Sequence, residues 1–259
     1  MSDQLSQEEF LRYSRQVLLP ELGRVGQRKL KSTSVLIVGV GGLGSPVALY
    51  LAAAGIGRIG LVDDDVVDVS NLQRQIIHDT PHVGVAKVDS ACERLLALNP
   101  TIRVEAVHER FTADSAERIA AGYDILVDCA DNFATRYLIN DLCVLTHRRD
   151  VFGAVNRFDG QVSVFDSRSG PCLRCLFPEP PPQKFAAVHE KGGLLGVLSG
   201  VIGSLQAAEV LKLAASIGKP LIGSMIAYDV LGATFQTLKV EKNPSCRGCG
   251  GLTSITELE

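Results

Sequence analysis

The chain has 259 residues, of which 46% are hydrophobic and 21% are charged, the balance of an ordinary folded domain. This length is sufficient for one large α/β domain with a well-buried core. The formal net charge of −3 argues against a nucleic-acid partner, because binding to phosphates requires clustered positive charge.

The sequence also argues against secretion and against a membrane span. The polar amino-terminal segment MSDQLSQEEFLRYSRQ lacks the apolar stretch of a secretory signal, so we expect a cytoplasmic protein. The longest apolar run, residues 194–205, is interrupted by glycine and serine and is too short to cross a bilayer. We therefore expect a buried helix there and no membrane partner. Seven cysteines, an odd number, favour metal or catalytic roles over a disulfide framework.

The first 150 residues are predicted to form two amino-terminal helices followed by alternating strands and helices. The predicted helices are 6–18, 23–30, a helix opened by Ser45 as N-cap with Pro46 in its first turn, 85–98, one between residues 107 and 124, and 132–146. The predicted strands are 34–38, 58–62, 102–107 and 124–129. This alternation predicts a Rossmann-like, doubly wound α/β fold with a mostly parallel sheet.

The pattern changes after residue 150. Strands at 151–154 and 161–165 flank a turn at 158–160, and a proline-rich loop then extends from 178 to 193. A long helix at 194–217 precedes two alternating segments, 222–228 and 234–240, which predict an antiparallel extension of the sheet. We interpret residues 1–259 as a single domain, with a nucleotide-binding half at 1–150 and a partner-binding half at 151–259.

A glycine pattern lies between the first strand of the alternating region and its helix. Gly39, Gly41, Gly42 and Gly44 occupy the turn, where glycines let the backbone approach phosphates and the helix N-terminus offers free N–H groups. Asp63, which ends the next strand 19 residues after Gly44, is placed to hold ribose hydroxyls. Taken alone, the pattern predicts an NAD-dependent oxidoreductase first, with a tight strand–helix turn that binds no ligand as the alternative.

Charged and amide residues follow that a hydride-transfer site does not need. They are Asp63, Asp64, Asp65, Ser70, Asn71, Arg74, Lys87, Asp131 and Asn132. Arginine and lysine neutralise charge on phosphate oxygens, and a carboxylate can hold Mg²⁺. Singly, Arg74 or Lys87 reads as a solvated surface charge. Together these residues favour phosphoryl or nucleotidyl transfer.

Four cysteines form two CxxC pairs separated by 70 residues. Cys172 and Cys175 form the first pair, and Cys246 and Cys249 form the second. Two such knuckles can enclose one tetrahedral Zn²⁺ with no open position, which is typical of a structural site. A redox pair or four free thiols are the alternatives, and neither explains two similar motifs.

The chain resembles the bacterial ubiquitin-activating-like family in an ordered set of motifs. They are RYSRQ at 12–16, GVGGLG, the Asp63 strand, SNLQRQ, Gly84 to Lys87 and DCADN. That family includes the adenylyltransferases of molybdopterin-synthase activation and of thiazole biosynthesis, and the resemblance spans nearly the whole chain. It implies a nucleotidyltransferase that uses ATP to adenylate the C-terminal Gly-Gly carboxylate of a ubiquitin-fold sulfur-carrier protein. Acyl-adenylate and pyrophosphate are the implied products, and many members carry zinc at the four cysteines.

The resemblance also implies residue roles. Gly41 and Gly42 line the ATP phosphates, with Gly39 and Gly44 in the same turn, and Asp63 binds the ribose. Asn71, Arg74 and Lys87 contact the triphosphate, and Asp131 places Mg²⁺; Asp65, Ser70 and Asn132 complete the nucleotide site. Arg15 reaches the active site of the other subunit of a homodimer. The catalytic set is thus Arg15, Arg74, Lys87 and Asp131.

One departure from the family concerns the loop before the long helix. Several relatives place there a cysteine that can bond covalently to the carrier, whereas Val188 or His189 stands at that position in this chain. A covalent acyl-disulfide is therefore doubtful, but adenylation needs no thiol. No rhodanese-like sequence follows, so we expect a separate protein to donate sulfur.

Two other classes of function stay open at this point. They are an NAD-dependent oxidoreductase and a non-catalytic partner-binding module. A tRNA-modifying dehydratase of the same superfamily is disfavoured by the net acidity. The molybdopterin, thiazole (thiamine), cysteine and tRNA-thiolation pathways all stay open as well, and the missing loop cysteine favours a molybdopterin-type activator.

Overall fold

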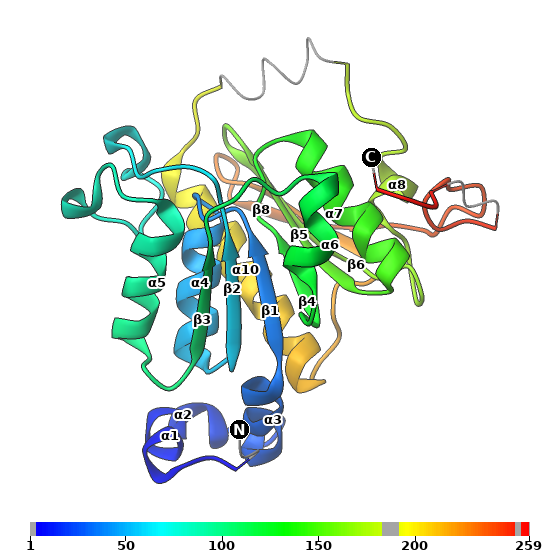
Figure 1. Ribbon diagram of the computed structural model, residues 1–259. Coiled ribbons are helices and arrows are strands. Elements are labelled where there is room, and N and C mark those ends of the chain that lie inside the picture. Colours follow the sequence, from blue (N-terminus) through cyan, green and yellow to red (C-terminus); the bar gives the residue numbers. More distant parts are fainter. Residues whose placement is uncertain (1–3, 183–191, 252–254, 259) are drawn as a thin grey trace.

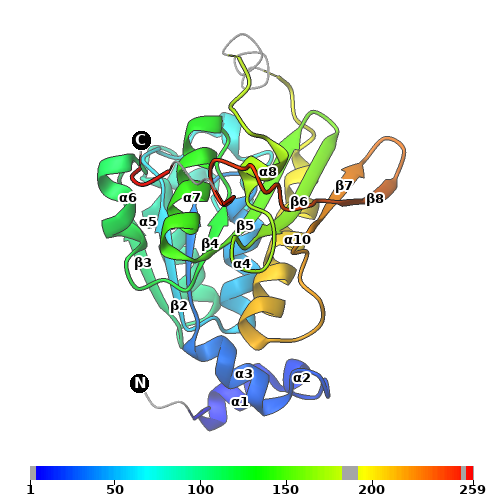
Figure 2. The ribbon, with the colours of Figure 1, turned by 90° about the vertical axis from the view of Figure 1, so that its right-hand side faces the viewer.

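The computed structural model describes residues 4–182, 192–251 and 255–258, which contain one eight-stranded sheet (Figures 1 and 2). The strand order is β3-β2-β1-β4-β5-β6-β7-β8. The strands are β1 (Ser34–Val38), β2 (Arg58–Val62), β3 (Arg103–Val107), β4 (Ile125–Asp128), β5 (Arg149–Asn156), β6 (Asp159–Phe165), β7 (Ser224–Asp229) and β8 (Thr234–Lys239). Neighbours from β3 to β5 pair in parallel, and β5 to β8 pair antiparallel. The predicted Rossmann-like sheet with an antiparallel extension is confirmed.

Helices cover both faces of the parallel part (Figure 2). The helices are α1 (Gln7–Arg12), α2 (Ser14–Val17), α3 (Gly23–Ser32), α4 (Gly44–Ala54), α5 (Lys87–Leu98), α6 (Ala113–Ala120), α7 (Phe133–Thr146), α8 (Leu173–Leu176) and α10 (Gly196–Ala215). Two short 3-10 helices lie at Val69–Asn71 and Thr80–His82. Helices α3, α4, α5 and α10 share one core with the sheet, and α6 and α7 share the other.

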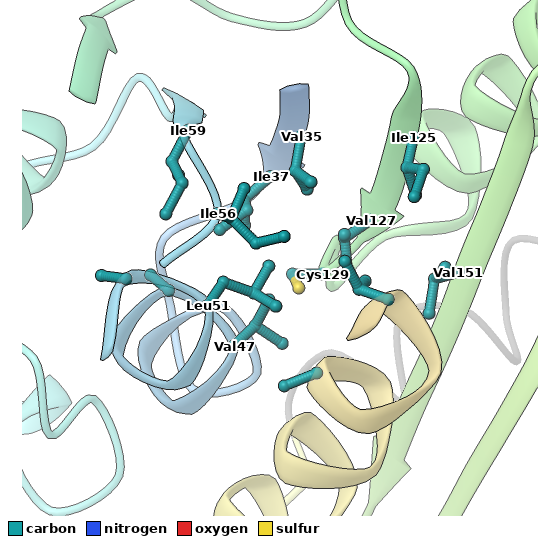
Figure 3. Close-up of a cluster of buried hydrophobic side chains, with 14 of the residues drawn as sticks. Val35, Ile37, Val47, Leu51, Ile56, Ile59, Ile125, Val127, Cys129 and Val151 are labelled. Atoms are coloured by element: carbon teal, nitrogen blue, oxygen red, sulfur yellow. The ribbon is translucent and has the colours of Figure 1, made fainter. Parts of the chain in front are cut away.

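Strand β1 shows why the central strands read as continuous apolar runs. Val35 and Ile37 pack toward Val47 and Leu51 of α4, as Figure 3 shows, while Leu36 packs against the opposite core with α6 and α7. All of these side chains are fully buried. Because burying one such side chain contributes about 1.5–3 kcal/mol, both faces of β1 need apolar residues.

Helix α10 is long and apolar enough, by length and composition, to cross a membrane. It instead lies beside α4 (Figure 2). Its residues Leu198, Ile202, Ala207 and Val210 are buried in the same cluster as β1. The predicted buried helix is confirmed, and its apolar composition reflects packing on several sides.

Some predicted helix starts are corrected by the structure. The region predicted as one helix at 6–18 is two, because the chain turns at Tyr13, whose buried hydroxyl accepts a hydrogen bond from Asn99 at 2.8 Å. Ser45 is not an N-cap: that position is Leu43, and the Ser45 hydroxyl donates to the carbonyl of Gly41 at 2.7 Å. Helix α5 begins at Lys87, two residues after the predicted start.

Asp150 on β5 is a buried carboxyl group without a hydrogen-bond partner in the part of the chain that the structure describes. Its side chain is fully buried and neither carboxyl oxygen is paired. Burial raises the pKa of Asp150 well above its ordinary value, the negative charge of Asp128 raises it further, and Arg136 opposes the shift. The folded state therefore keeps the Asp150 proton at pH values at which the unfolded chain has already lost it, so the protein becomes less stable as the pH rises through this range.

Replacing Asp150 by asparagine is expected to stabilise the protein increasingly as the pH rises. Below the unfolded pKa both states hold the proton, so the two proteins differ least near pH 4. Between the unfolded pKa and the raised folded pKa, the free energy of unfolding of the wild type falls as the pH rises, whereas that of Asp150→Asn does not. At pH 8 we expect Asp150→Asn to be more stable than the wild type by on the order of 1–2 kcal/mol. Urea unfolding at several pH values measures this, and a difference that does not grow with pH contradicts it.

Candidate active site

A cleft of about 770 Å³ lies at the carboxyl ends of the parallel strands. It is bordered by the segments that follow β1, β2 and β4 and by the turn between β5 and β6. The connections β1–β2 and β2–β3 extend the sheet on one side of β1, and the chain then crosses from β3 to β4 on the other side of β1. This reversal is the switch point at which open α/β sheets bind ligands. In Figure 1 this edge lies opposite the amino-terminal helices.

The glycine loop after β1 is shaped by close backbone approaches. Gly39 has a φ of +95°, and a Cβ atom there would lie 2.7 Å from the carbonyl oxygen of Cys129. A Cβ at Gly44 would lie 2.1 Å from the carbonyl oxygen of Gly39. Gly39 and Gly44 therefore allow the turn itself, and Gly39, Gly41 and Gly42 line the cleft.

Both peptide groups of Val40 are held in place. Its N–H donates to Asp63 Oδ2 at 2.7 Å, and its carbonyl lies 3.0 Å from His78 Nε2. A carbonyl only accepts, so His78 donates from Nε2, and in the neutral ring Nδ1 accepts from Ser90. Burial lowers the pKa of His78, which favours this neutral form. Because a trans peptide points its C=O and N–H in opposite directions, the N–H of Gly41 points away from His78.

Asp63 joins the glycine loop to the segment after β2. Its Oδ1 accepts from the N–H of Asp65 at 2.9 Å, in addition to the bond from Val40. Burial raises the pKa of this carboxyl, and the charge of Lys87 opposes the shift. The oxygens of Asp63, Asp64 and Asp65 lie within 4.8 Å of one another, so this turn concentrates negative charge beside the cleft.

Two of the predicted cations line the cleft. Lys87, the first residue of α5, is buried with only 7% of its side chain exposed, and its Nζ lies 2.7 Å from Asp65 Oδ2. Arg74 donates from NH1 to the carbonyl of Ser70 at 3.0 Å. Because Asp65 is exposed and can move, the Lys87 ammonium can turn from it toward an anion bound in the cleft.

Asp131 and Asn132 line the cleft from the segment after β4. Asn132 is the N-cap of α7, where its side chain accepts from the N–H of Thr135 at 2.9 Å. Asp131 is exposed, and within the described part of the chain its side chain accepts one long hydrogen bond, from Asn132 Nδ2 to Oδ1 at 3.4 Å. Most of the lone pairs of the Asp131 carboxylate therefore face solvent in the cleft.

Four predicted site residues do not border this cleft. The Ser70 hydroxyl donates to Asp68 at 2.6 Å, and Asn71 accepts from the N–H of Asp68, so both side chains cap a 3-10 turn. Gly44 serves the close packing described above. Arg15 is exposed on α2, at the far end of the sheet (Figure 1). The nucleotide contacts predicted for these residues stay predictions.

Three arginines border the cleft that the sequence did not single out: Arg110, Arg136 and Arg157. Arg136 is buried, donates to the carbonyls of Gly153 and Ala130, and lies 3.6 Å from Asp128 Oδ2. The one signal for it was position, since it follows Asn132 by one helical turn. Arg110 and Arg157 lie in turns without a motif, so no sequence signal pointed to them.

The four paired cysteines meet at the opposite side of α7 from the sheet centre. Their Sγ atoms all lie within 4.8 Å of one another, with Cys172 3.6 Å from Cys246 and Cys175 3.4 Å from Cys249. Tetrahedral coordination with metal–sulfur bonds of about 2.3 Å places sulfurs about 3.8 Å apart. Their spacing therefore fits one metal ion.

The electrostatics of the cysteine cluster also call for a cation. Its shared hydrogen bonds, with that from Cys172 the largest cause, lower the pKa of Cys249 to about 5, while burial raises the pKa of Cys175 to about 11. Four adjacent thiols cannot all ionise without a positive charge among them. The N–H groups of Asn243 and Gly248 donate to Cys175 and Cys246 at 3.4 Å, as expected in knuckles of this kind.

The cysteine cluster is attached to α7 by a buried ion pair. Arg174, between the first two cysteines, donates from Nε and NH2 to the two oxygens of Asp141 at 2.8 and 2.7 Å. Its guanidinium also lies 4.6 Å from the centre of the Tyr137 ring. The knuckle formed by Cys172 and Cys175 is thereby fixed on α7.

The remaining cysteines have structural roles. Cys129 lies in the core cluster of Figure 3, and burial raises its pKa well above its ordinary value. Burial likewise raises the pKa of Cys143 and of Cys92. Thiols with raised pKa values are poor nucleophiles. The loop position of Val188 or His189 lies outside the described residues.

Comparison with known proteins gives a consistent family. The model of the ThiF family matches residues 13–248. The chain is 50% identical over 258 residues to the sulfur carrier protein adenylyltransferase of Thermus thermophilus, covering 98% of this chain and 95% of that protein. It is 49% identical over 256 residues to the adenylyltransferase and sulfurtransferase MOCS3 of Sus scrofa, and it spans 56% of the length of that relative.

Solved structures agree with the sequence comparison. The structure of Escherichia coli MccB with ATP has a TM-score of 0.83 and 25% identity, covering 92% of this chain and 74% of that one. The structure of MccB with N-formylated MccA has a TM-score of 0.85 at 24% identity, over 92% and 75% of the two chains. The matched span of 13–248 includes the glycine loop, the residues that border the cleft and three of the four clustered cysteines, and the chain belongs to the ThiF family.

Proposed function

We propose that this chain uses ATP to adenylate the C-terminal carboxylate of a ubiquitin-fold sulfur-carrier protein that ends in Gly-Gly. The products are the carrier acyl-adenylate and pyrophosphate, and the carrier is one of the molybdopterin or thiamine type. One observation carries the proposal: Arg74, Lys87 and Asp131 border a single cleft with the glycine loop. Half of the residues are identical to those of a sulfur carrier protein adenylyltransferase over nearly the whole of both chains.

The reaction requires little acid–base chemistry. A C-terminal carboxylate has a pKa of about 3.5, so it is ionised at neutral pH and attacks the α-phosphorus without a general base. Its oxygen forms the bond to phosphorus as the bond to pyrophosphate breaks. The protein aligns the two reactants and stabilises the charge that develops on the phosphate oxygens, which suits Lys87 and Arg74. In this proposal Asp63, beside the glycine loop, holds the ribose hydroxyls.

Mg²⁺ fits the exposed carboxylate of Asp131. Oxygen ligands suit this ion. Asp131 borders the cleft, and its carboxylate accepts one long hydrogen bond, from Asn132. When bound, Mg²⁺ neutralises charge on the phosphates. Zn²⁺ fits the four cysteines, because four sulfurs at tetrahedral spacing leave no open coordination position and hence hold a structural ion.

Two surfaces are candidates for binding partner proteins, one on strands β5 to β8 and one on the amino-terminal helices. A hollow of about 450 Å³ on β5 to β8, bordered by Tyr228 and Gln236, offers a face for the carrier, with its tail entering the cleft. Leu11 and Leu18 are 76% and 73% exposed beside Arg15, which supports a homodimer in which Arg15 enters the partner's cleft. Sulfur then comes from a separate donor protein.

ATP–pyrophosphate exchange tests the proposal. Purified protein, Mg²⁺ and each candidate carrier are incubated with labelled pyrophosphate, beside the same carriers lacking the last glycine. We expect exchange only with an intact Gly-Gly tail. Exchange that does not depend on the tail, or the absence of exchange with every carrier despite ATP binding, would overturn the assignment.

Replacing Asp131 by asparagine is expected to lower the exchange rate by about 100-fold or more, because a neutral amide holds Mg²⁺ poorly. The side chain keeps its size and is exposed, so the unfolding temperature should be unchanged. Asp114→Asn, an exposed aspartate in the first turn of α6, is the matched control and should exchange like the wild type. Exchange by Asp131→Asn within about threefold of wild type contradicts the assigned role.

A further inference from the structure

Ser199 in the first turn of α10 carries a buried hydroxyl without a hydrogen-bond partner among the described residues. Its side chain is fully buried, yet the residue borders the cleft. Two other helical serines, Ser45 and Ser204, each donate to the carbonyl four residues earlier at 2.7 Å. The Ser199 hydroxyl makes no such bond to the carbonyl of Leu195, so it is free to donate to another acceptor.

The position of Ser199 is fixed against the glycine loop. A Cβ atom at Gly42 would lie 2.9 Å from Ser199 Oγ and 3.6 Å from Arg74 Cγ, so hydroxyl and arginine flank the same glycine. Farther along α10, a Cβ at Gly203 would lie 2.6 Å from the carbonyl oxygen of Leu43. The close crossing of α10 over the start of α4 thus leaves the hydroxyl little freedom to move away from Gly42.

The surroundings of Ser199 favour a negatively charged oxygen. Helix α10 is 20 residues long, and its N-cap, Leu195, makes no side-chain capping hydrogen bond. The positive end of its dipole therefore faces the cleft beside Arg74.

We propose that the Ser199 hydroxyl donates a hydrogen bond to an anionic oxygen of the reactants bound over Gly42. This inference rests on the proposed adenylation, and it adds a reactant-binding group from the carrier-binding half to the nucleotide site. Two sources share the required chemistry: a phosphate oxygen of ATP and the terminal carboxylate of the carrier. In either case α10 connects the face that receives the carrier to the glycine loop.

Ser199→Ala is the discriminating variant, because binding and structural roles have opposite consequences for it. A hydrogen bond to a charged group is worth roughly a tenfold change in affinity or more. Removing a buried hydroxyl that has no partner in the free protein relieves a desolvation cost. We therefore expect the free variant to unfold at the same temperature as the wild type or higher, while its reactant binding weakens about tenfold.

The experiment has two binding arms and one stability arm. The dissociation constant for ATP with Mg²⁺ is measured by calorimetry without carrier, and the carrier concentration for half-maximal pyrophosphate exchange is measured at saturating ATP. A loss of about tenfold in the first arm assigns the bonded oxygen to ATP, and the same loss in the second arm alone assigns it to the carrier. Thermal unfolding of the free proteins is the third arm. Ser204→Ala, whose hydroxyl is paired within the same helix, is the control and should bind both reactants as the wild type does.

Two results would overturn the inference. One is Ser199→Ala with both constants within about twofold of wild type. The other is a lower unfolding temperature of the free variant together with a loss confined to the fraction of active protein, because that marks a structural role. Failure of the proposed function is recognised separately, since the wild type itself would then show no carrier-dependent exchange.

Discussion

Lys87→Ala is expected to lower ATP–pyrophosphate exchange by about 100- to 1,000-fold, one of the two largest effects that the site predicts. The ammonium is buried beside the cleft, where a charge acts more strongly on phosphate oxygens than in water, and it is held by the exposed carboxylate of Asp65 at 2.7 Å. The loss should appear in the exchange rate more than in the ATP concentration for half-maximal rate, because the charge on the phosphate oxygens increases in the transition state.

Two further variants separate charge from packing. Lys87→Arg keeps the charge and should retain more activity than Lys87→Ala, although the larger guanidinium fits a site built for an ammonium less well. Lys219→Ala removes an exposed lysine outside the cleft and should leave exchange unchanged. Equal activity of Lys87→Ala and Lys219→Ala would show that Lys87 does not act on the reactants.

Loss of the metal at the cysteine cluster is expected to have the largest effect on stability. Cys249→Ser removes one of four ligands that join the carboxyl-terminal knuckle to Cys172 and Cys175, so the zinc content should fall well below one per chain. We expect the unfolding temperature to drop by roughly 10 °C or more, since loss of a structural metal is among the most destabilising changes known.

Cys92→Ser is the matched control for the metal prediction. Cys92 is a half-buried thiol on α5, outside the cluster, so its replacement should change neither the zinc content nor the unfolding temperature by more than about 2 °C. Metal content is measured by elemental analysis and stability by calorimetry. A Cys249→Ser protein that keeps full zinc and wild-type stability would refute a four-cysteine site.

Much of the fold could be predicted because its central strands are buried on both faces. The runs at 34–38 and 58–62 coincide with β1 and β2 to the residue, since apolar residues on both faces leave a strand little freedom in its limits. The helix starts were less predictable. Tyr13 interrupts the first helix because its hydroxyl reaches Asn99, a contact between residues far apart in the sequence.

Site residues that belong to a sequence motif could be predicted, whereas residues that only the chain topology brings to the cleft could not. Asp63 and Asp131 follow β2 and β4, strands whose ends meet at the switch point of a doubly wound sheet, so the sequence suffices to bring them together. Lys87 begins α5 and was predicted from its motif. Ser70 and Asn71 also belong to a motif, yet local hydrogen bonds to Asp68 occupy their side chains. Arg157 and Ser199 reach the cleft only through the antiparallel extension and the crossing of α10, which no local pattern encodes.

The other functions that the sequence left open fare differently. Membership of the ThiF family and the gathering of Arg74, Arg136 and Lys87 around one cleft set aside the NAD-dependent oxidoreductase, which needs no such set of cations. A partner-binding module without activity predicts carrier binding but no chemistry on ATP. That difference is accessible to a single experiment.

The most direct test asks which phosphorus of ATP reaches the carrier. The protein, Mg²⁺ and a Gly-Gly carrier are incubated with ATP radiolabelled at the α-phosphorus or, in parallel, at the γ-phosphorus, and the carrier is isolated by rapid acid quenching. The account predicts that only the α-label joins the carrier, that a carrier lacking its last glycine stays unlabelled, and that Lys87→Ala labels the carrier far more slowly than the wild type does. Transfer of the γ-label, or no label on any carrier although the protein binds ATP, would contradict adenylation.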